Sequence, residues 1–161
     1  AQAEAQRAEM WRMRETIPEG EKRFGGSVKH DISVPLGRTV DFLKEGGAAV
    51  AAYDPTFELS VYGHVGDGNL HYNVLVPPGE DRLAFTDRIT RELAPTLYDI
   101  AVGMGGTFSA EHGVGRLKRG LLQHYADPGR YRVLRGLKGL FDPLGVMNPG
   151  TMVDPSIGLP E

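Results

Sequence analysis

The chain has 161 residues, and its 18 Lys and Arg against 21 Asp and Glu give a formal net charge of −3. This length fits one medium domain, and the balanced charge gives no electrostatic support for a nucleic-acid groove. The sequence contains no cysteine, which excludes disulfide scaffolds, thiolate zinc sites, iron–sulfur clusters and thiol nucleophiles. Any metal site must therefore use histidine and carboxylate ligands.

Nothing in the sequence indicates a membrane span or a secretion signal. No apolar run approaches the roughly 18 residues that a transmembrane helix needs, and the polar N-terminus lacks the pattern of a signal peptide. We therefore expect a soluble, cytoplasmic protein with no transmembrane segment. Because residues 1–9 are polar and helix-forming, we also expect that the chain begins inside a helix and is a fragment of a longer protein.

The first third of the chain predicts a helix, a strand and a second helix. Residues 1–17 are rich in helix formers, and Pro18 is expected to end that helix. Residues 27–35 alternate β-branched and polar side chains, which is typical of a strand. Helical spacing begins again at Leu36, and Gly46-Gly47 predicts the end of a helix of about ten residues.

The middle of the chain predicts a hairpin followed by a long helix. Residues 58–77 form two strand-like runs around a turn at residues 66–69, Gly-Asp-Gly-Asn. Asp81 stands where an acidic residue favours the start of a helix. An apolar stripe then continues to Gly103, and Pro95 is expected to kink this helix; the stripe consists of Ile89, Leu93, Leu97 and Ile100.

The last part predicts a glycine-rich segment and two further helices. Residues 105–115 are expected to form a strand and loop, and residues 117–125 carry a helical stripe. Asp127-Pro128 is a cap followed by proline at the first helical position, which opens a helix to about Phe141. Strands interleaved with helices through tight hairpins indicate an α+β fold with an antiparallel sheet.

The first candidate site is the pair His64 and His71, which flank the predicted turn. A turn at residues 66–69 brings these imidazoles to adjacent strands, where both can approach one ion. Asn73 is two residues beyond His71 and projects to the same side. The alternative is that the two histidines only form local hydrogen bonds beside a glycine-rich turn.

The second candidate site is Glu111-His112, with glycines on both sides. A carboxylate beside an imidazole offers a hard oxygen ligand and a proton acceptor. Two histidines and Glu111 would leave vacant coordination positions, as catalytic metal sites do. The alternative is a solvated Glu-His pair in a loop.

Two cations, Arg14 and Lys29, are candidates for binding a substrate carboxylate. Arg binds a carboxylate through two parallel hydrogen bonds, and Lys binds it as a point charge. The alternative for each is a charge that faces solvent. No complete dinucleotide-binding fingerprint, Walker sequence or nucleophile elbow is present, so nucleotide binding by this chain alone is not expected.

Five stretches together resemble, in order, the C-terminal domain of the FAD-linked oxidases of the vanillyl-alcohol oxidase type. This family includes D-lactate, glycolate and D-2-hydroxyglutarate dehydrogenases. The resemblance covers nearly the whole chain and rests on WRMRE at 11–15, KHDISVP at 29–35, GHVGDGNLHYN at 63–73, GTFSAEHGVG at 106–115 and FDPLGVMNPG at 141–150.

The resemblance implies a ferredoxin-like antiparallel sheet flanked by helices, and an N-terminal FAD domain that residues 1–161 do not include. It implies that FAD is held mainly by that missing domain. It also assigns roles to single residues: His64, His71 and Glu111 as ligands of a divalent metal, most often zinc; His112 as the catalytic base and a substrate contact; Arg14, Lys29 and Asn73 as further substrate contacts; and Asn148 as a cofactor contact.

The function implied is oxidation of a small D-2-hydroxy acid to the 2-oxo acid, with an unknown electron acceptor and a possible homodimer. Two residues give conflicting indications of which acid is the substrate. Pro18 stands where the D-2-hydroxyglutarate enzymes carry threonine, whereas Ala110 matches the form of that branch. A stand-alone His/His/Glu metallohydrolase and a non-catalytic binding module are the alternatives; isolated, the chain is expected to be inactive.

Overall fold

The computed structural model describes residues 2–64 and 66–153, and the chain divides into two compact units, residues 1–110 and 111–161. The first unit holds α1 (Glu4–Glu15), α2 (Ile17–Arg23), β1 (Ser27–Ser33), a 3-10 turn (Leu36–Arg38), α3 (Thr39–Tyr53), β2 (Leu59–Gly63), β3 (Asn69–Leu75), α4 (Arg82–Glu92) and α5 (Ala94–Gly103). The second unit holds α6 (Arg119–Tyr125) and α7 (Pro128–Phe141). Among the described residues, every helix is too short or too polar to span a lipid bilayer.

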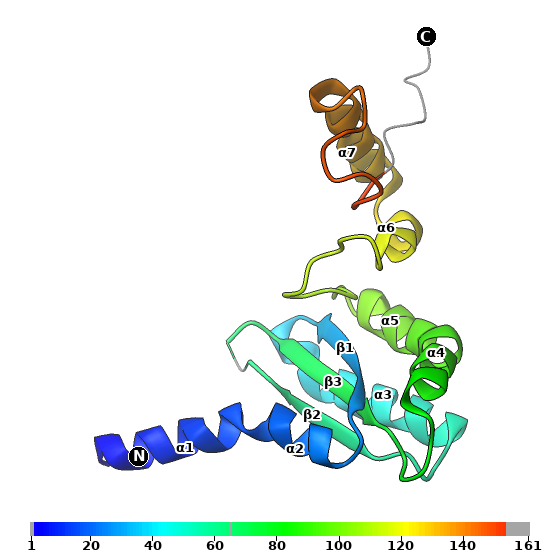
Figure 1. Cartoon of the computed structure of the whole chain (residues 1–161). Helices are drawn as coiled ribbons and strands as arrows, with labels where there is room; N and C mark the ends of the chain where they lie inside the picture. The colour runs from blue at the N-terminus through cyan, green and yellow to red at the C-terminus, as the bar shows by residue number, and fades with distance from the viewer. Residues whose placement is uncertain (1, 65, 154–161) are drawn as a thin grey trace. The chain divides into compact units, whose positions relative to one another are not determined.

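The sheet has three antiparallel strands in the order β1-β3-β2, which confirms the α+β prediction (Figure 1). The succession β1–α3–β2–β3–α4/α5 follows the first five elements of the ferredoxin-like β-α-β-β-α-β pattern. After α5, the chain returns beside β1 and forms one antiparallel bridge, between Thr107 and Ser33. Within the described residues, this bridge stands where the last strand of the pattern would be.

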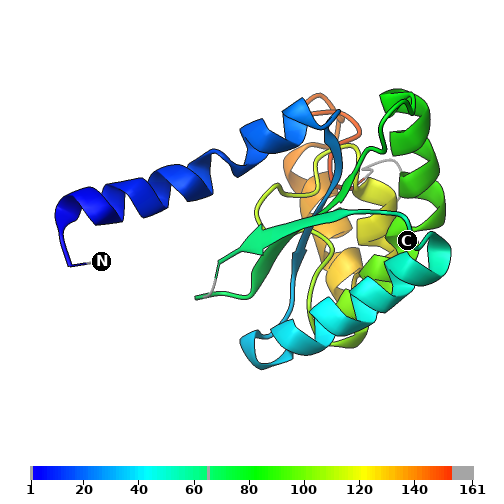
Figure 2. The same ribbon diagram turned by 90° about the horizontal axis from the view of Figure 1, so that it is seen from below.

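One face of the sheet packs against α3, α4 and α5 and forms the core (Figures 1 and 2). The Tyr72 ring of β3 lies 5.4 Å from the Phe42 ring of α3, and the His30 ring of β1 lies 5.8 Å from the Tyr98 ring of α5. Each large apolar side chain buried in this way contributes about 1.5–3 kcal/mol. The helices α3, α4 and α5 therefore cover one face, and the opposite face of the sheet carries polar side chains.

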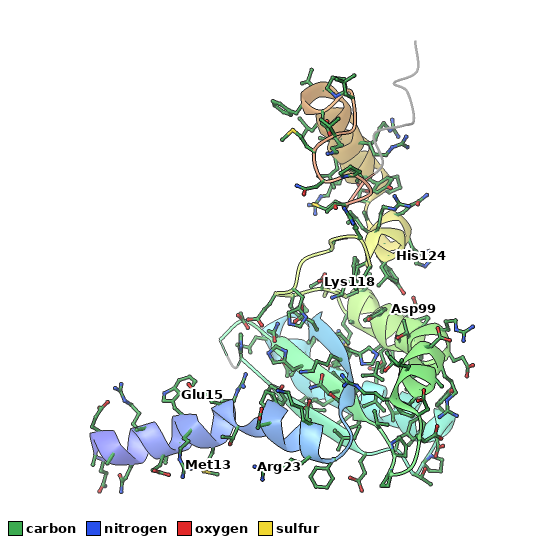
Figure 3. All side chains as sticks on the ribbon, viewed as in Figure 1. Met13, Glu15, Arg23, Asp99, Lys118 and His124 are labelled. Atoms are coloured by element: carbon green, nitrogen blue, oxygen red, sulfur yellow. The ribbon has the colours of Figure 1, made fainter. Side chains whose placement is uncertain are left out.

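The prediction that Pro18 ends the first helix is wrong. α1 ends three residues earlier at Glu15, and the chain continues as α2, with Pro18 in its first turn. Proline suits that position because the first backbone N–H groups of a helix have no partner within the helix. The methionines Met10 and Met13, three residues apart on α1, are not buried, and Met13 is 70% exposed and projects away from the helix (Figure 3).

The prediction that Gly46-Gly47 ends the second helix is also wrong, because α3 continues to Tyr53. The alanine-rich stretch at residues 48–52 favours helix and extends it past the two glycines. Gly46 instead allows close packing between α3 and β3. A Cβ at this position would lie 3.3 Å from the Tyr72 hydroxyl, so the missing side chain lets the tyrosine of β3 approach the helix closely.

The elements predicted from caps agree well with the structure. Asp81 caps α4 by accepting a 2.8 Å hydrogen bond from the Ala84 N–H, and Asp127 caps α7 in the same way through Arg130. Pro95 lies in the first turn of α5 and divides the expected long helix into α4 and α5. Cap chemistry is local, which explains why these boundaries could be predicted.

The glycine-rich segment at residues 105–115 contains no regular strand beyond the Thr107 bridge, so this part of the prediction is wrong. Thr107 donates a 2.7 Å backbone hydrogen bond to the Ser33 carbonyl and accepts one of 3.1 Å from the Ser33 N–H. Three residues further on, the Ala110 N–H donates to the Asp31 carbonyl at 3.1 Å. These three hydrogen bonds hold residues 107–110 beside β1, and Glu111 follows directly.

We expect Gly106→Ala to lower the free energy of unfolding by about 1–3 kcal/mol, the usual cost of overpacking. The added Cβ would lie 2.1 Å from the Ser33 carbonyl oxygen and 2.8 Å from that of Ala101, and neither backbone atom can move alone. Denaturant unfolding of the purified protein measures this. The control is Gly20→Ala in α2, where nothing lies within 4 Å of the new Cβ, and we expect a gain of roughly 0.5–1 kcal/mol. Equal effects of the two substitutions would contradict the steric explanation.

Candidate substrate and metal site

The polar face of the sheet brings together three of the residues that the sequence singled out. In the antiparallel register, Lys29 of β1 faces Asn73 of β3, and Asp31 faces His71. Directly opposed residues project to the same face, and residues two apart on one strand share that face. The polar face therefore carries Lys29, His71 and Asn73 on neighbouring strands, as the alternation along β3 predicted, together with Asp31.

Two residues of this face, Asp31 and His71, belong to a group of potential metal ligands. Asp31, His71, Glu111 and His112 each offer one ligand atom, and all four atoms lie within 4.8 Å of one another. Asp31 is 2% exposed and accepts a 3.1 Å hydrogen bond from the Asn69 amide. Carboxylate oxygens and imidazole nitrogens suit a borderline divalent cation such as zinc. The donor set thus fits the class of metal that the resemblance implies.

Sequence reasoning missed Asp31. It did single out the other three members, His71 and Glu111 as ligands and His112 as the base. The signal for Asp31 was present, because it follows Lys29 by two residues in a predicted strand and therefore shares its face. What the sequence could not give was the register that sets Asp31 opposite His71.

His64 lies near His71, as the predicted turn required, but it is not a member of this group. The two rings are 5.7 Å apart between centroids, and the His64 Nδ1 lies 3.5 Å from an Asp67 carboxylate oxygen. A backbone hydrogen bond from Asn69, and then the contact with His64, lower the pKa of Asp67 below its usual value. The role of His64 as a metal ligand stays a prediction.

Arg14 and Lys29 both lie near residues of the polar face. The Arg14 guanidinium stands 4.5 Å from the centre of the Tyr62 ring, a cation–π distance. Tyr62 belongs to β2 and faces His71 in the register. The Lys29 side chain is 53% exposed, and its Nζ lies 4.0 Å from a carboxylate oxygen of Glu21. Each cation keeps enough exposure to receive an anion.

Asn148 belongs to the second unit, in the loop after α7. Its φ of 47° is left-handed, a conformation that asparagine tolerates. Asp142 fixes this loop by accepting hydrogen bonds from the backbone N–H groups of Val146 at 2.9 Å and Met147 at 3.0 Å, and from Lys138 Nζ at 2.7 Å. The Lys138 hydrogen bond is the main cause that holds the pKa of Asp142 below its ordinary value.

A pocket of about 350 Å³ adjoins this loop. Asn148 lines it together with apolar side chains of α7 and of the loop, among them Leu137, Phe141 and Met147. A mainly apolar hollow with a few polar groups at its wall is typical of sites that bind small organic ligands.

Comparison with known proteins identifies the family of this chain. Residues 1–152 match the family model for the C-terminal domain of FAD linked oxidases. The chain is 38% identical over 150 residues to a D-2-hydroxyglutarate dehydrogenase of Stutzerimonas stutzeri, covering 93% of this chain and 32% of that protein. It is 38% identical over 145 residues to the mitochondrial D-2-hydroxyglutarate dehydrogenase of Bos taurus, covering 89% and 25%.

A third relative, a putative mitochondrial D-lactate dehydrogenase of Schizosaccharomyces pombe, is 32% identical over 158 residues, covering 92% of this chain and 29% of that protein. The chain thus spans about a third or less of the length of these relatives. The match gives no support to the metallohydrolase alternative. The chain belongs to the family of FAD-linked oxidase C-terminal domains.

Proposed function

We propose that this chain is the substrate- and metal-binding domain of a flavin-dependent dehydrogenase that oxidises a D-2-hydroxy acid to the 2-oxo acid. The observation that carries the proposal is the group Asp31, His71, Glu111 and His112, whose ligand atoms lie within 4.8 Å of one another. The names of the relatives support the reaction, and two cations near the same polar face support an anionic substrate.

We place D-2-hydroxyglutarate ahead of D-lactate as the substrate. A hydroxy acid with two carboxylates can engage both Arg14 and Lys29, whereas a monocarboxylate engages one of them fully. Arg14 suits a carboxylate because its guanidinium matches two oxygens at once. D-Lactate, the substrate in the name of the relative from Schizosaccharomyces pombe, is the second candidate.

In the proposed reaction, the residues of this chain bind the acid and move one proton. His112 accepts the proton of the substrate hydroxyl through a ring nitrogen, for which its imidazole must be neutral. His71, Glu111 and either His64 or Asp31 hold the divalent cation, for which we propose zinc. The cation, when bound, supplies positive charge that stabilises the developing negative charge on the hydroxyl oxygen.

FAD, when bound, would supply the acceptor for the α-hydrogen together with the two electrons of its C–H bond. We propose that an N-terminal domain of the same protein holds most of this cofactor and that Asn148 contacts it. The loop fixed by Asp142 and the apolar pocket beside Asn148 support that contact. We propose in addition that a further electron acceptor reoxidises the flavin and that the protein assembles as a homodimer.

The test uses the full-length protein without oxygen and without any added electron acceptor. We expect D-2-hydroxyglutarate to bleach the visible absorbance of the flavin and the L enantiomer to leave it unchanged. D-Lactate and glycolate are compared in the same assay. Bleaching by D-lactate alone would move the assignment to the D-lactate branch, and bleaching by none of these acids would overturn the proposed function.

A further inference from the structure

Tyr62 is an aromatic residue of the polar face that the proposed function does not use. It belongs to β2, an edge strand of the sheet, and it stands opposite His71 of β3 in the antiparallel register. Directly opposed side chains share one face, and the two ring centroids are 5.0 Å apart. The Arg14 guanidinium carbon lies 4.5 Å from the centre of the same tyrosine ring. Tyr62 thus contacts both a proposed metal ligand and a proposed substrate-binding cation.

Arg14 differs from the rest of α1 in its burial. Among residues 4–15, Arg14 alone is partly buried, and the other side chains of the helix are exposed. Its contact with Tyr62 joins this otherwise exposed helix to β2. The position of the Arg14 side chain is therefore set by a residue of the sheet and not by packing of the helix itself.

The positive charge of Arg14 is also treated differently from the other charges of its helix. The two earlier arginines of α1 each pair with a glutamate one turn before them: Arg7 with Glu4, and Arg12 with Glu9. Within the part of the chain that the structure describes, Arg14 has no carboxylate partner. Tyr62 does not replace one, because burial raises the pKa of its hydroxyl and the ring is neutral at neutral pH.

A cation–π contact orders an arginine without using up its capacity to bind an anion. The face of a tyrosine ring attracts the cation electrostatically. The guanidinium has five N–H donors, and a carboxylate engages two of them. A free arginine side chain is flexible, and fixing it when a ligand binds costs free energy. A ring that orders Arg14 in advance lowers that cost.

We propose that Tyr62 is a positioning residue, whose ring holds the Arg14 side chain at the polar face where its guanidinium binds a carboxylate of the substrate. The inference rests on the proposed function, in which Arg14 binds a carboxylate, and adds to it the residue that orients Arg14. The same ring lies beside His71, so the arginine that it holds is placed next to a proposed ligand of the metal.

The experiment measures binding to the full-length protein by calorimetry, with 2-oxoglutarate as the probe. This acid carries both carboxylates of D-2-hydroxyglutarate and has no hydroxyl to oxidise, so the flavin stays oxidised. The quantity of interest is the Arg14 factor, defined as the fold increase in the dissociation constant that Arg14→Ala causes. We expect Tyr62→Ile to lower the Arg14 factor by about twofold to tenfold, the cost of immobilising one flexible side chain.

Two controls separate the ring from other effects of the substitution. Tyr62→Phe keeps a π face and should retain the wild-type Arg14 factor, whereas isoleucine has none but suits a strand. A merely structural role for Tyr62, or one exerted through His71 and the metal, would weaken binding with and without Arg14 alike. The Arg14 factor would then stay unchanged.

Hydrogen exchange of the ligand-free, full-length protein gives a second test that leaves the sheet intact, should Tyr62→Ile fail to fold. Arg14→Ala removes the contact between α1 and β2, so the amide protons of α1 should exchange faster. Arg12→Ala is the matched control, because Arg12 is an exposed arginine of the same helix, paired with Glu9. Equal acceleration by the two substitutions would overturn the inference.

Two binding results would also overturn it: an unchanged Arg14 factor in Tyr62→Ile, or a factor that falls as far in Tyr62→Phe. Flavin bleaching by D-2-hydroxyglutarate together with an unchanged factor would sink this inference alone. A lowered factor in Tyr62→Ile, without bleaching by any hydroxy acid, would overturn the proposed reaction and leave the role of Tyr62 standing. A wild-type protein that does not bind 2-oxoglutarate would overturn both this inference and the proposed dicarboxylate substrate.

Discussion

His112→Ala in the full-length protein is expected to lower kcat by about 10²–10⁴-fold while the metal stays bound, because general base catalysis is typically worth that factor. His112 lies in the group with Asp31, His71 and Glu111, so a cation held by that group, and a hydroxyl bound to it, would be close to the His112 imidazole. Steady-state turnover with D-2-hydroxyglutarate and elemental analysis of the same preparation measure the two quantities together.

The metal content separates the two roles that His112 could have in this group. A base can be removed without releasing the cation, whereas a ligand cannot. Loss of the metal in His112→Ala would show that the residue is a ligand, and unchanged turnover would exclude it as the base. His124→Ala is the matched control, because His124 is an exposed histidine on α6, outside the ligand group, and should leave both quantities unchanged.

His71→Ala is expected to remove the metal and the activity in parallel. Loss of a residue that only supports a ligand typically costs 10–100-fold in metal affinity, and loss of a direct ligand should cost at least about as much. Two observations support His71 as a ligand: its ring lies beside that of His64, and it stands opposite Asp31 in the sheet register. Metal titration of the metal-free protein, with His124→Ala as the control, gives the affinity directly.

A preparation of His71→Ala that retained full metal content at wild-type affinity would refute the assignment of this ligand. Activity that fell while the metal remained would instead place His71 in contact with substrate. The same titration on Asp31→Asn and His64→Ala would show which of these two side chains completes the metal site.

The fold could be predicted from the sequence wherever the signal was local. The caps Asp81 and Asp127 bond to backbone groups three residues away, and their helices begin where expected. Pro18 and Gly46 misled the prediction because their effect depends on context. Pro18 is neutral in the first turn of a helix, and Gly46 is tolerated in α3 because Tyr72 fills the space beside it.

The candidate site was predictable in part, for the same physical reason. Alternation along β3 placed His71 and Asn73 on one face, and the glycine turn placed His64 beside His71. Asp31 and Tyr62 were missed because their importance comes from residues distant in sequence. Asn69 is 38 residues from Asp31, and the Tyr62 ring contacts a residue of α1, so no local pattern reports these contacts.

The exposure of α1 has a consequence for how Arg14 meets its ligand. Twelve residues form this helix, and none of them is buried. Isolated helices shorter than about 12–15 residues are marginal in water, and ion pairs such as Glu9–Arg12 add only about 0.2–0.5 kcal/mol each. The amide protons of α1 should therefore exchange with solvent faster than those of α3. Binding of an anion to Arg14 would slow the exchange in α1, because part of the binding free energy would stabilise the helix.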